Sequence, residues 1–270
     1  MSAASTTLTG AALERSTSDT LNIYWKEAKY DFLSRLRLPV YTISTIMFPI
    51  MFYVLFGLLL NRGHEVSGVS VAGYMMATYG TFGVMGASLF GFGVGVAMER
   101  GLGWLQVKRA SPMPPSAYFA AKVVTCMAFS AIIVALLMTL GVAFGGVHVT
   151  AAQALQLVGT LVVGSICFCA MGLAIGSFAG PNSAPAIVNL LYLPMSFASG
   201  LWMPIEFLPK FLQRLAPVLP PYHLGQLALG VVGAGQGTAV RHWEALIGFA
   251  LLCLGIARIG FQRDEGKSAG

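Results

Sequence analysis

Residues 152–179 read AQALQLVGTLVVGSICFCAMGLAIGSFA, without one Asp, Glu, Lys, Arg or His. A hydrocarbon core of about 30 Å is crossed by ~20 apolar residues in helical form, because every backbone N–H and C=O must be bonded within the segment. Five other stretches resemble this one, and the six candidate spans are 38–60, 69–97, 118–145, 152–179, 184–203 and 242–260. The sequence therefore predicts an all-α, polytopic membrane protein with six transmembrane helices. The charged outer stripes that would indicate soluble amphipathic helices are absent.

Charge is scarce and unevenly placed. The chain is 56% hydrophobic and 10% charged, where soluble domains have about 25% charged residues. With a cytoplasmic N-terminus, the cytoplasmic segments hold twelve of the 16 basic residues: Arg15, Lys26, Lys29, Arg35, Arg37, Arg100, Lys108, Arg109, Lys122, Arg258, Arg263 and Lys267. The outer loops hold Arg62, Lys210, Arg214 and Arg241. By the positive-inside rule both termini are cytoplasmic, and the net charge of +6 reflects topology and anionic lipid, not nucleic acid.

The segments flanking the spans differ in character. Residues 1–19 are rich in Ser, Thr and Ala, which predicts a disordered cytoplasmic tail. Residues 263–270 are expected to form a cytoplasmic tail at the other end of the chain. Residues 20–37 place apolar side chains every third or fourth position, namely Leu21, Trp25, Ala28, Phe32 and Leu36. This spacing predicts an amphipathic helix lying in the membrane interface. The alternative is that these residues simply extend the first span.

Residues 98–110 follow the second span and form the largest basic interruption of the apolar pattern. They predict a short cytoplasmic helix, ended by prolines at positions 112, 114 and 115 because proline cannot continue a helix. Trp104 and Leu105 lie between charged ends, which suits insertion into a groove on a soluble partner. The alternative is a solvated basic loop.

Side chains that could drive transport or catalysis are missing from the pattern. Ion-driven transporters place groups with a changeable charge at membrane depth, and the span interiors lack them. The run from Gly260 to Lys267 has five residues between its glycines where a phosphate-binding loop needs four. The four cysteines all fall within spans, and the four histidines lie in or beside outer loops without metal-ligand spacing. We therefore assign no catalytic residue, metal or cofactor to this chain, and any energy for transport must come from another polypeptide.

Two groups of residues, in order and on this topology, resemble a known family. Glu99-Arg100-Gly101, followed by Leu105, Pro112 and Lys122, resembles the signature of type-2 ATP-binding-cassette export permeases, which export drugs, lipids and polysaccharides. The run 199–204, SGLWMP, with the prolines at 209, 217, 220 and 221, is similar to the external segment of that family. The resemblance covers about residues 20–262. Leu102, Gly103 and Trp104 depart from the family pattern, which affects the detailed contacts of the coupling helix and not its location.

The resemblance implies an assembly of several chains. Two permease subunits, identical or homologous, would pair in the bilayer, and each would dock an ATPase subunit that binds the ATP and Mg. The residues implied in coupling to the ATPase are Glu99, Arg100, Gly101, Trp104, Leu105, Lys108 and Arg109. Residues 204–235 contain two short apolar or amphipathic pieces, which predict re-entrant or interfacial helices capping the exit. The implied external gate residues are Trp202, Pro204, Phe207 and Phe211; the alternative is a loop lying on the headgroups.

The resulting hypothesis is a permease subunit of an ATP-driven exporter, multi-pass in a prokaryotic inner membrane. Its cargo would be hydrophobic or amphiphilic, such as a drug, a lipid or a glycolipid or polysaccharide. The candidate residues of the path come from spans one, two and five: Phe48, Phe52, Tyr79, Phe82, Asn189, Tyr192 and Phe197. A packing role is the alternative for each. Two other functions remain open, an ATP-independent channel or facilitator and a membrane anchor or sensor for an ATPase.

Overall fold

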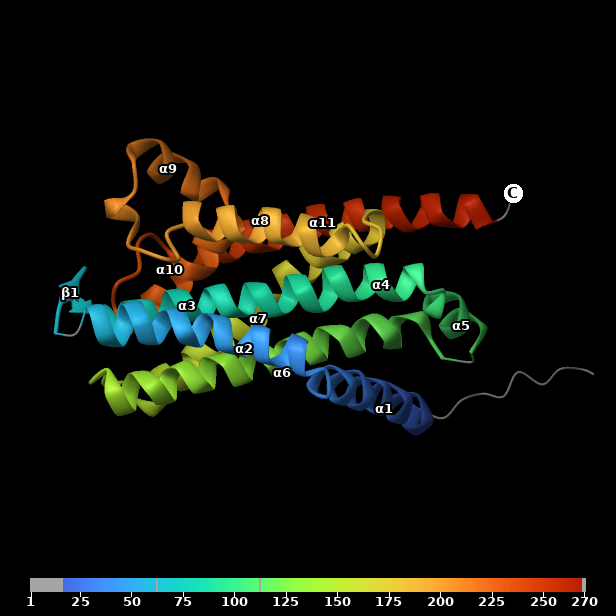
Figure 1. Ribbon diagram of the computed structural model, residues 1–270, viewed down its shortest axis with the longest axis horizontal. Coiled ribbons are helices and arrows are strands. Elements are labelled where there is room, and N and C mark those ends of the chain that lie inside the picture. Colours follow the sequence, from blue (N-terminus) through green and yellow to red (C-terminus); the bar gives the residue numbers. More distant parts are fainter. Residues whose placement is uncertain (1–16, 62, 112, 269–270) are drawn as a thin grey trace, which may run out of the picture.

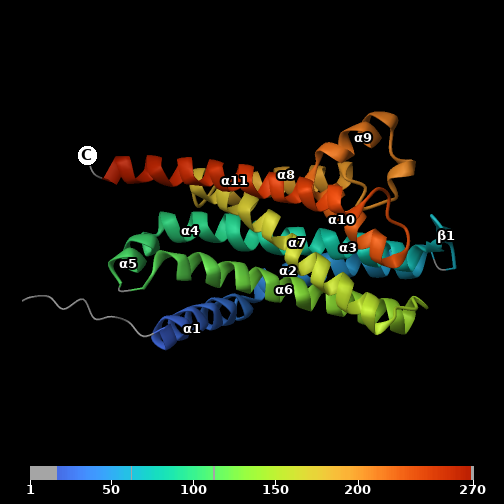
Figure 2. The same ribbon diagram turned by 180° about the vertical axis from the view of Figure 1, so that it is seen from behind.

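Long helices run side by side along one axis in the computed structural model, which describes residues 17–61, 63–111 and 113–268 (Figures 1 and 2). Five helical segments are long and apolar enough to cross a membrane: Pro39–Leu60, Val71–Gly101, Pro115–Phe144, Ala151–Phe178 and Ala239–Gln262. The first joins α2 (Pro39–Phe52) to a π-helical end, η1 (Tyr53–Leu60), and the last is most of α11 (Ala239–Ser268). The structure confirms the predicted all-α, polytopic membrane class.

The second span is the centre of the bundle. It is built from α3 (Val71–Ser88), the π-helical segment η2 (Leu89–Val94) and α4 (Gly95–Gly101) without a break. Its residues are 83% buried, whereas only 17% of the Pro39–Leu60 window is buried. Small residues on every face of α3 let the neighbouring helices approach from all sides. The other spans therefore pack around this one.

The fourth span shows how glycines permit that packing. On α7 (Ala151–Phe178), a Cβ added at Gly172 would lie 2.9 Å from the backbone nitrogen of Gly93 in η2. A Cβ added at Gly176 would lie 2.8 Å from the carbonyl oxygen of the same residue. Backbone approaches backbone here, so the four-residue glycine spacing serves contacts within the subunit.

We expect Gly172→Ala to destabilise the protein, because the new methyl group meets backbone atoms that cannot move aside cheaply; overpacking of this kind costs about 1–3 kcal/mol. The measurement is the thermal unfolding midpoint in detergent. Gly159→Ala is the matched control on the same helix, since nothing lies within 4 Å of its added Cβ. Alanine also favours a helix over glycine, so the control midpoint should stay or rise. Equal midpoints for both variants would contradict this packing.

The fifth predicted span is shorter than the apolar run suggested. Residues 184–203 were expected to be helical, but α8 covers only Ala184–Ala198, 15 residues or about 22 Å at 1.5 Å per residue. The helix ends because Gly200 adopts a left-handed turn with φ of +75°. Pro204 then starts the external segment.

The external segment, predicted at 204–235, contains several short helices. They are η3 (Ile205–Phe207), α9 (Lys210–Leu215), η4 (Ala216–Val218) and α10 (Pro220–Val232). The α9–η4 piece and α10 are bent by 90° at Leu219. A hairpin of β1 (Glu65–Val66) and β2 (Val69–Ser70) lies at the same end of the bundle (Figure 1). The re-entrant character of the segment stays a prediction.

The opposite end carries α1 (Thr17–Leu36), α5 (Trp104–Ala110), the start of α6 (Pro115–Phe144) and the end of α11 (Figures 1 and 2). The helix predicted at 20–37 is thus present as α1, with one side on α6 through Phe32 and Phe129, whose ring centroids are 5.4 Å apart. Trp25 is 68% exposed on its other side. The disordered tail was predicted over 1–19, but residues 17–19 belong to α1, and residues 1–16 lie outside the described residues. In the tail predicted at 263–270, residues 263–268 continue α11, and residues 269–270 lie outside the described residues.

Candidate functional site

The loop after the second span is two helical pieces with a break between them. A single helix was expected over 98–110, but α4 ends at Gly101 and α5 begins at Trp104. The break occurs because Gly103 has φ of +76°, a left-handed conformation that glycine adopts without strain. Gly101 is needed for a different reason, since a Cβ there would lie 2.0 Å from the Pro181 ring.

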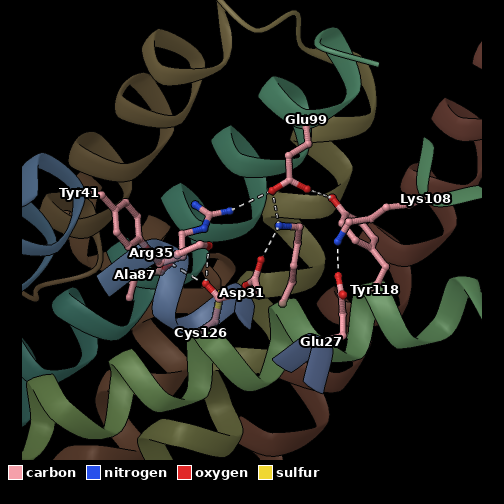
Figure 3. Close-up of polar contacts among 11 residues, drawn as sticks. Glu27, Asp31, Arg35, Tyr41, Ala87, Glu99, Lys108, Tyr118 and Cys126 are labelled. Carbon is pink, nitrogen blue, oxygen red and sulfur yellow. Dashed lines mark hydrogen bonds and ion pairs between the residues drawn. The ribbon is translucent and has the colours of Figure 1, made fainter. Parts of the chain in front are cut away.

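A buried cation lies directly behind this loop. Lys122 on α6 has a side chain only 1% exposed, and its Nζ donates to Glu99 Oε1 at 2.7 Å and to Asp31 Oδ1 at 3.2 Å (Figure 3). Tyr118 donates its hydroxyl proton to the other Glu99 oxygen at 2.7 Å. Arg35 on α1 lies 3.7 Å from the same carboxylate. These charges join α1, α4 and α6, and we call the five residues the ionic cluster.

Neighbouring opposite charges favour the ionised forms of Asp31 and Arg35. Burial alone would raise the pKa of Asp31, but the Lys122 ammonium and the Arg35 guanidinium hold that pKa below its ordinary value. Burial opposes the charge of Arg35 as well, yet the neighbouring Tyr41, Asp31 and Glu99 raise its pKa. The Arg35 guanidinium also lies 5.3 Å from the centre of the Tyr41 ring. A buried charge pair of this kind is costly to break, because removing one partner leaves the other uncompensated.

Two further contacts attach the loop to its surroundings. Lys108 on α5 pairs with Glu27 on α1, and its Nζ lies 4.8 Å from the Tyr118 ring centre (Figure 3). Arg100 donates to the carbonyl oxygens of Ser177 and Ala179, the latter at 2.8 Å, at the C-terminal end of α7. A cation is favourable there because the last carbonyls of a helix lack partners. The loop is therefore held by α1, α6 and α7 together.

The other side of the loop is apolar and exposed. Its large apolar side chains with their exposed fractions are Met98 (47%), Leu102 (71%), Trp104 (55%) and Val107 (62%). We call these four residues the loop face. Leu105 points the other way and packs with Phe119 and Phe261. Exposed aromatic and aliphatic side chains clustered at and just beyond the end of a span mark a site for contact with another molecule.

A second feature lies within the apolar part of the bundle, where α2 and α8 border a groove of about 580 Å³. Three of the predicted path residues line it: Phe48, Asn189 and Tyr192. Ser44 and Thr45 add hydroxyl groups to a lining that is otherwise mostly apolar.

Aromatic rings continue inward from the groove. Phe48 stands 4.9 Å from Phe52, whose ring lies 5.4 Å from Trp202, and Phe82 stacks on Tyr192 at 4.7 Å, all between centroids. Further contacts add Tyr79, which donates to the Trp202 carbonyl at 3.2 Å, and Phe197, 6.3 Å from the Trp202 ring. Six predicted path residues and one predicted gate residue thus form one aromatic cluster.

Comparison with known proteins assigns the family. Residues 24–232 match the family described as ABC-2 type transporter. This chain belongs to that family. A protein of Bacillus subtilis (strain 168) named "Putative transport permease YvfS" is 26% identical over 248 residues, which cover 91% of this chain and 99% of that protein. The chain is accordingly the membrane subunit of an ABC transporter.

In this ABC-2 permease, the predicted coupling residues divide into two groups. Glu99, Arg100 and Lys108 bond to neighbouring helices of the same subunit, and Leu105 packs inward with them. Trp104 is exposed on the loop face. Arg109 belongs to α5, but its side chain is outside the described part of the structure. Their role in coupling stays a prediction.

The remaining path and gate residues occupy varied positions. Tyr79 and Phe82 have no exposed surface, so they form the wall behind the groove rather than its open lining. At the external end Pro204 is buried, whereas Phe207 and Phe211 are 70% and 71% exposed on η3 and α9. A path or gate function of these residues also stays a prediction.

Sequence reasoning missed the partners of the coupling residues on α1. Glu27, Asp31 and Arg35 recur at four-residue spacing, which places them along one helix face toward α4, α5 and α6. The signal was available, because the chain has only ten acidic residues and two of them lie on this face. The apolar residues at every third or fourth position of the same helix led instead to the prediction of a helix lying in the membrane interface.

Removing one charge from the ionic cluster tests its structural role. We expect Glu99→Gln to lower the free energy of unfolding by about 3–5 kcal/mol, because buried Lys122 loses its closest counter-charge. Chemical unfolding in detergent, monitored by tryptophan fluorescence, measures this change.

A double variant, Glu99→Gln with Lys122→Met, should lose less stability than the sum of the two single variants, since coupled charges are not additive. Glu244→Gln, at an exposed carboxylate on α11, is the control and should behave like the unaltered protein. Strict additivity would show that the two charges do not act together.

Proposed function

We propose that this chain is the permease half of an ATP-driven exporter for hydrophobic or amphiphilic molecules in a prokaryotic inner membrane, with both termini in the cytoplasm. The observation that carries the proposal is the loop face, an exposed apolar surface held rigidly at the end of the bundle that also carries α1 and the end of α11. That end is the cytoplasmic one by the distribution of basic residues.

The loop face suits an ATPase subunit as its partner. Trp104 at its centre supplies the large, rigid apolar contact that dominates many protein interfaces. The ionic cluster and the Arg100 contacts bind the loop to α1, α6 and α7, so force applied to the loop reaches three helices at once. One ATPase would dock on each permease subunit.

A second permease subunit would cover α2 and α8. Residues of α2 expose a continuous apolar side, with Ile43 59%, Met47 51% and Met51 51% exposed. This span has the smallest buried share of the five long ones. A symmetric pair placed there would enclose the two grooves and form a path between subunits.

The groove lining favours an amphiphilic cargo. Its walls are mainly aliphatic and aromatic, and the polar groups of Ser44, Thr45 and Asn189 are few and separate. Such a surface accepts an apolar chain and offers isolated hydrogen bonds to a head group. It offers no charged side chain to a small ion.

The first experiment is purification of the tagged chain from its native host in mild detergent, with mass spectrometry of the accompanying proteins and an assay of ATP hydrolysis. A stoichiometric ATP-binding-cassette ATPase supports the exporter. Its absence after mild crosslinking would favour a channel or facilitator. A co-purified ATPase whose function with the permease tolerates polar substitutions in the groove would favour an anchor or sensor, because an exporter should lose transport with such substitutions.

Trp104→Ala should weaken that ATPase association by at least ~10-fold, because loss of a central aromatic contact typically costs 2 kcal/mol or more. Titration of purified ATPase onto the permease in nanodiscs measures the affinity. Phe207→Ala, at a similarly exposed ring on the external side, is the matched control and should bind like the unaltered protein. Equal affinity for Trp104→Ala would show that the loop face is not the docking site.

Met47→Cys should form disulfide-linked dimers in native membranes, because Met47 is exposed at the proposed pairing face and the four native cysteines are buried. Gel electrophoresis without reductant measures them. Val163→Cys, 49% exposed on α7, is the control on a lipid-facing side and should stay monomeric. Crosslinking of both positions, or of neither, would contradict a homodimer through α2.

A further inference from the structure

Two histidines meet at the external end, away from the groove and the loop face. His223 on α10 and His242 in the first turn of α11 are 8% and 6% exposed. Their Nδ1 atoms are 2.9 Å apart, a hydrogen-bond distance. This contact joins the external segment to the last span.

The outer nitrogens of the two rings fix the number of protons. Nε2 of His223 lies 3.0 Å from the Pro217 carbonyl oxygen, and Nε2 of His242 lies 2.7 Å from the Gln236 carbonyl oxygen. A carbonyl oxygen only accepts, so each Nε2 must carry a proton. A neutral imidazole has no second proton, and two neutral rings would therefore point their Nδ1 lone pairs at each other. The 2.9 Å contact requires a third proton between the rings.

We propose that His223 and His242 share this third proton, forming a singly charged clamp that fastens α10 to α11 and responds to external pH. Losing the proton leaves two facing lone pairs, and gaining another leaves two facing N–H groups. Both changes replace an attraction with a repulsion. The stabilisation is therefore lost as pH rises through the value at which the pair releases its third proton, and it is lost again in acid when a fourth proton binds.

The surroundings favour one charge over two. Burial lowers the pKa of His223, the Pro217 carbonyl raises it, and the positive charge of Arg241 on α11 lowers it further. Tyr222 on α10 has its ring centroid 5.5 Å from that of His223. On α3, Tyr74 interacts with Tyr222 and with Glu206 of η3. η4 supplies an uncharged carbonyl, and the exposed Lys210 and Arg214 belong to the preceding α9. A second positive charge beside Arg241 is unfavourable.

The clamp also fixes the loop between the two helices. Gln226 on α10 accepts a hydrogen bond from the Gln236 backbone N–H at 2.8 Å, and the Gln236 carbonyl in turn binds His242. α10, the loop and α11 are thus one hydrogen-bonded unit. The inference rests on the proposed function only in placing this unit outside the cell, and the proton count is independent of any ATPase.

The decisive measurement is two-bond ¹H–¹⁵N NMR of the ¹⁵N-histidine-labelled protein in nanodiscs over about pH 5 to 9, around the ordinary histidine pKa of about 6.5. The chain has four histidines, so single His→Asn variants assign every signal. We expect three protonated ring nitrogens in the pair over part of this range, with both Nε2 atoms protonated throughout it. Two neutral rings, with only two protonated nitrogens between them, over the whole range would overturn the proposal. A spectrum changed by EDTA would also overturn it, because a metal ion would then occupy the place of the proton.

Hydrogen exchange tests the mechanical part of the proposal. His242→Phe should speed exchange of the α10 amides by ~10-fold at neutral pH, as expected for loss of a charge-assisted hydrogen bond. In His242→Asn an uncharged amide takes the place of Nδ1, so the pH dependence of α10 protection should disappear while much of the protection remains. His148→Asn is the control and should match the unaltered protein. Unchanged α10 exchange in His242→Phe would show that the pair does not hold α10.

Discussion

The Lys122 ammonium, almost without solvent contact, constrains how the helices meet at the α1–α5 end of this permease. A cation removed from water costs several kcal/mol unless counter-charges lie against it. Glu99 and Asp31 supply them from two other elements, so α1, α4 and α6 can meet in only one arrangement. Apolar packing is less selective inside a bilayer, because lipid chains compete equally well for the same surfaces. Charge compensation therefore specifies the arrangement of α1, α4 and α6, which apolar burial alone does not specify.

The same constraint connects the loop between α4 and α5 with the aromatic cluster. Phe82 and Glu99 belong to one uninterrupted span, and 17 residues of helix between them correspond to about 25 Å. That span is packed on all sides, so it moves as a body and not by bending freely. Its one irregular part is η2, a π-helical segment of the kind often found where a helix changes register or serves function. Gly172 and Gly176 pack closely against the backbone of this segment. The fourth span therefore contacts the second span where the helix of the second span is irregular.

The sequence predicted the features that depend on local composition. A transmembrane helix is recognised from the length and apolarity of its own residues, and the spans with long uncharged runs were found near their observed bounds. The errors arose at single glycines. Apolar residues continue from α8 through Trp202 and Met203, so the run gave no sign that Gly200 would end the helix with a positive φ. Gly103 divided the predicted 98–110 helix for the same reason.

The contacts of the site could be predicted less well than its location. Glu99 and Lys108 resemble solvated charges of a cytoplasmic loop, and their acidic and basic partners on α1 are more than 60 residues away in the chain. Only folding brings α1 beside α4 and α5. The aromatic path residues, by contrast, were chosen by span and residue type, and they gather because α2, α3 and α8 are neighbours. Residue type was thus sufficient to predict which side chains form the cluster. Burial in the structure distinguishes the side chains that line the groove from those that lie behind it.

Exposure alone does not distinguish a lipid-facing side from a subunit interface, because an apolar face costs nothing in hydrocarbon. The polar atoms of the α2–α8 groove make that distinction. Ser44 and Asn189 are exposed there at the depth of the spans, and a hydroxyl or amide left against acyl chains is unfavourable. The exposed sides of α7 and α11 present mainly aliphatic residues such as Val163, Ile166, Leu251 and Leu252, which acyl chains can cover without penalty. The groove therefore needs a second subunit, water or a cargo with a polar part, and each of these fits the proposed path between paired permeases.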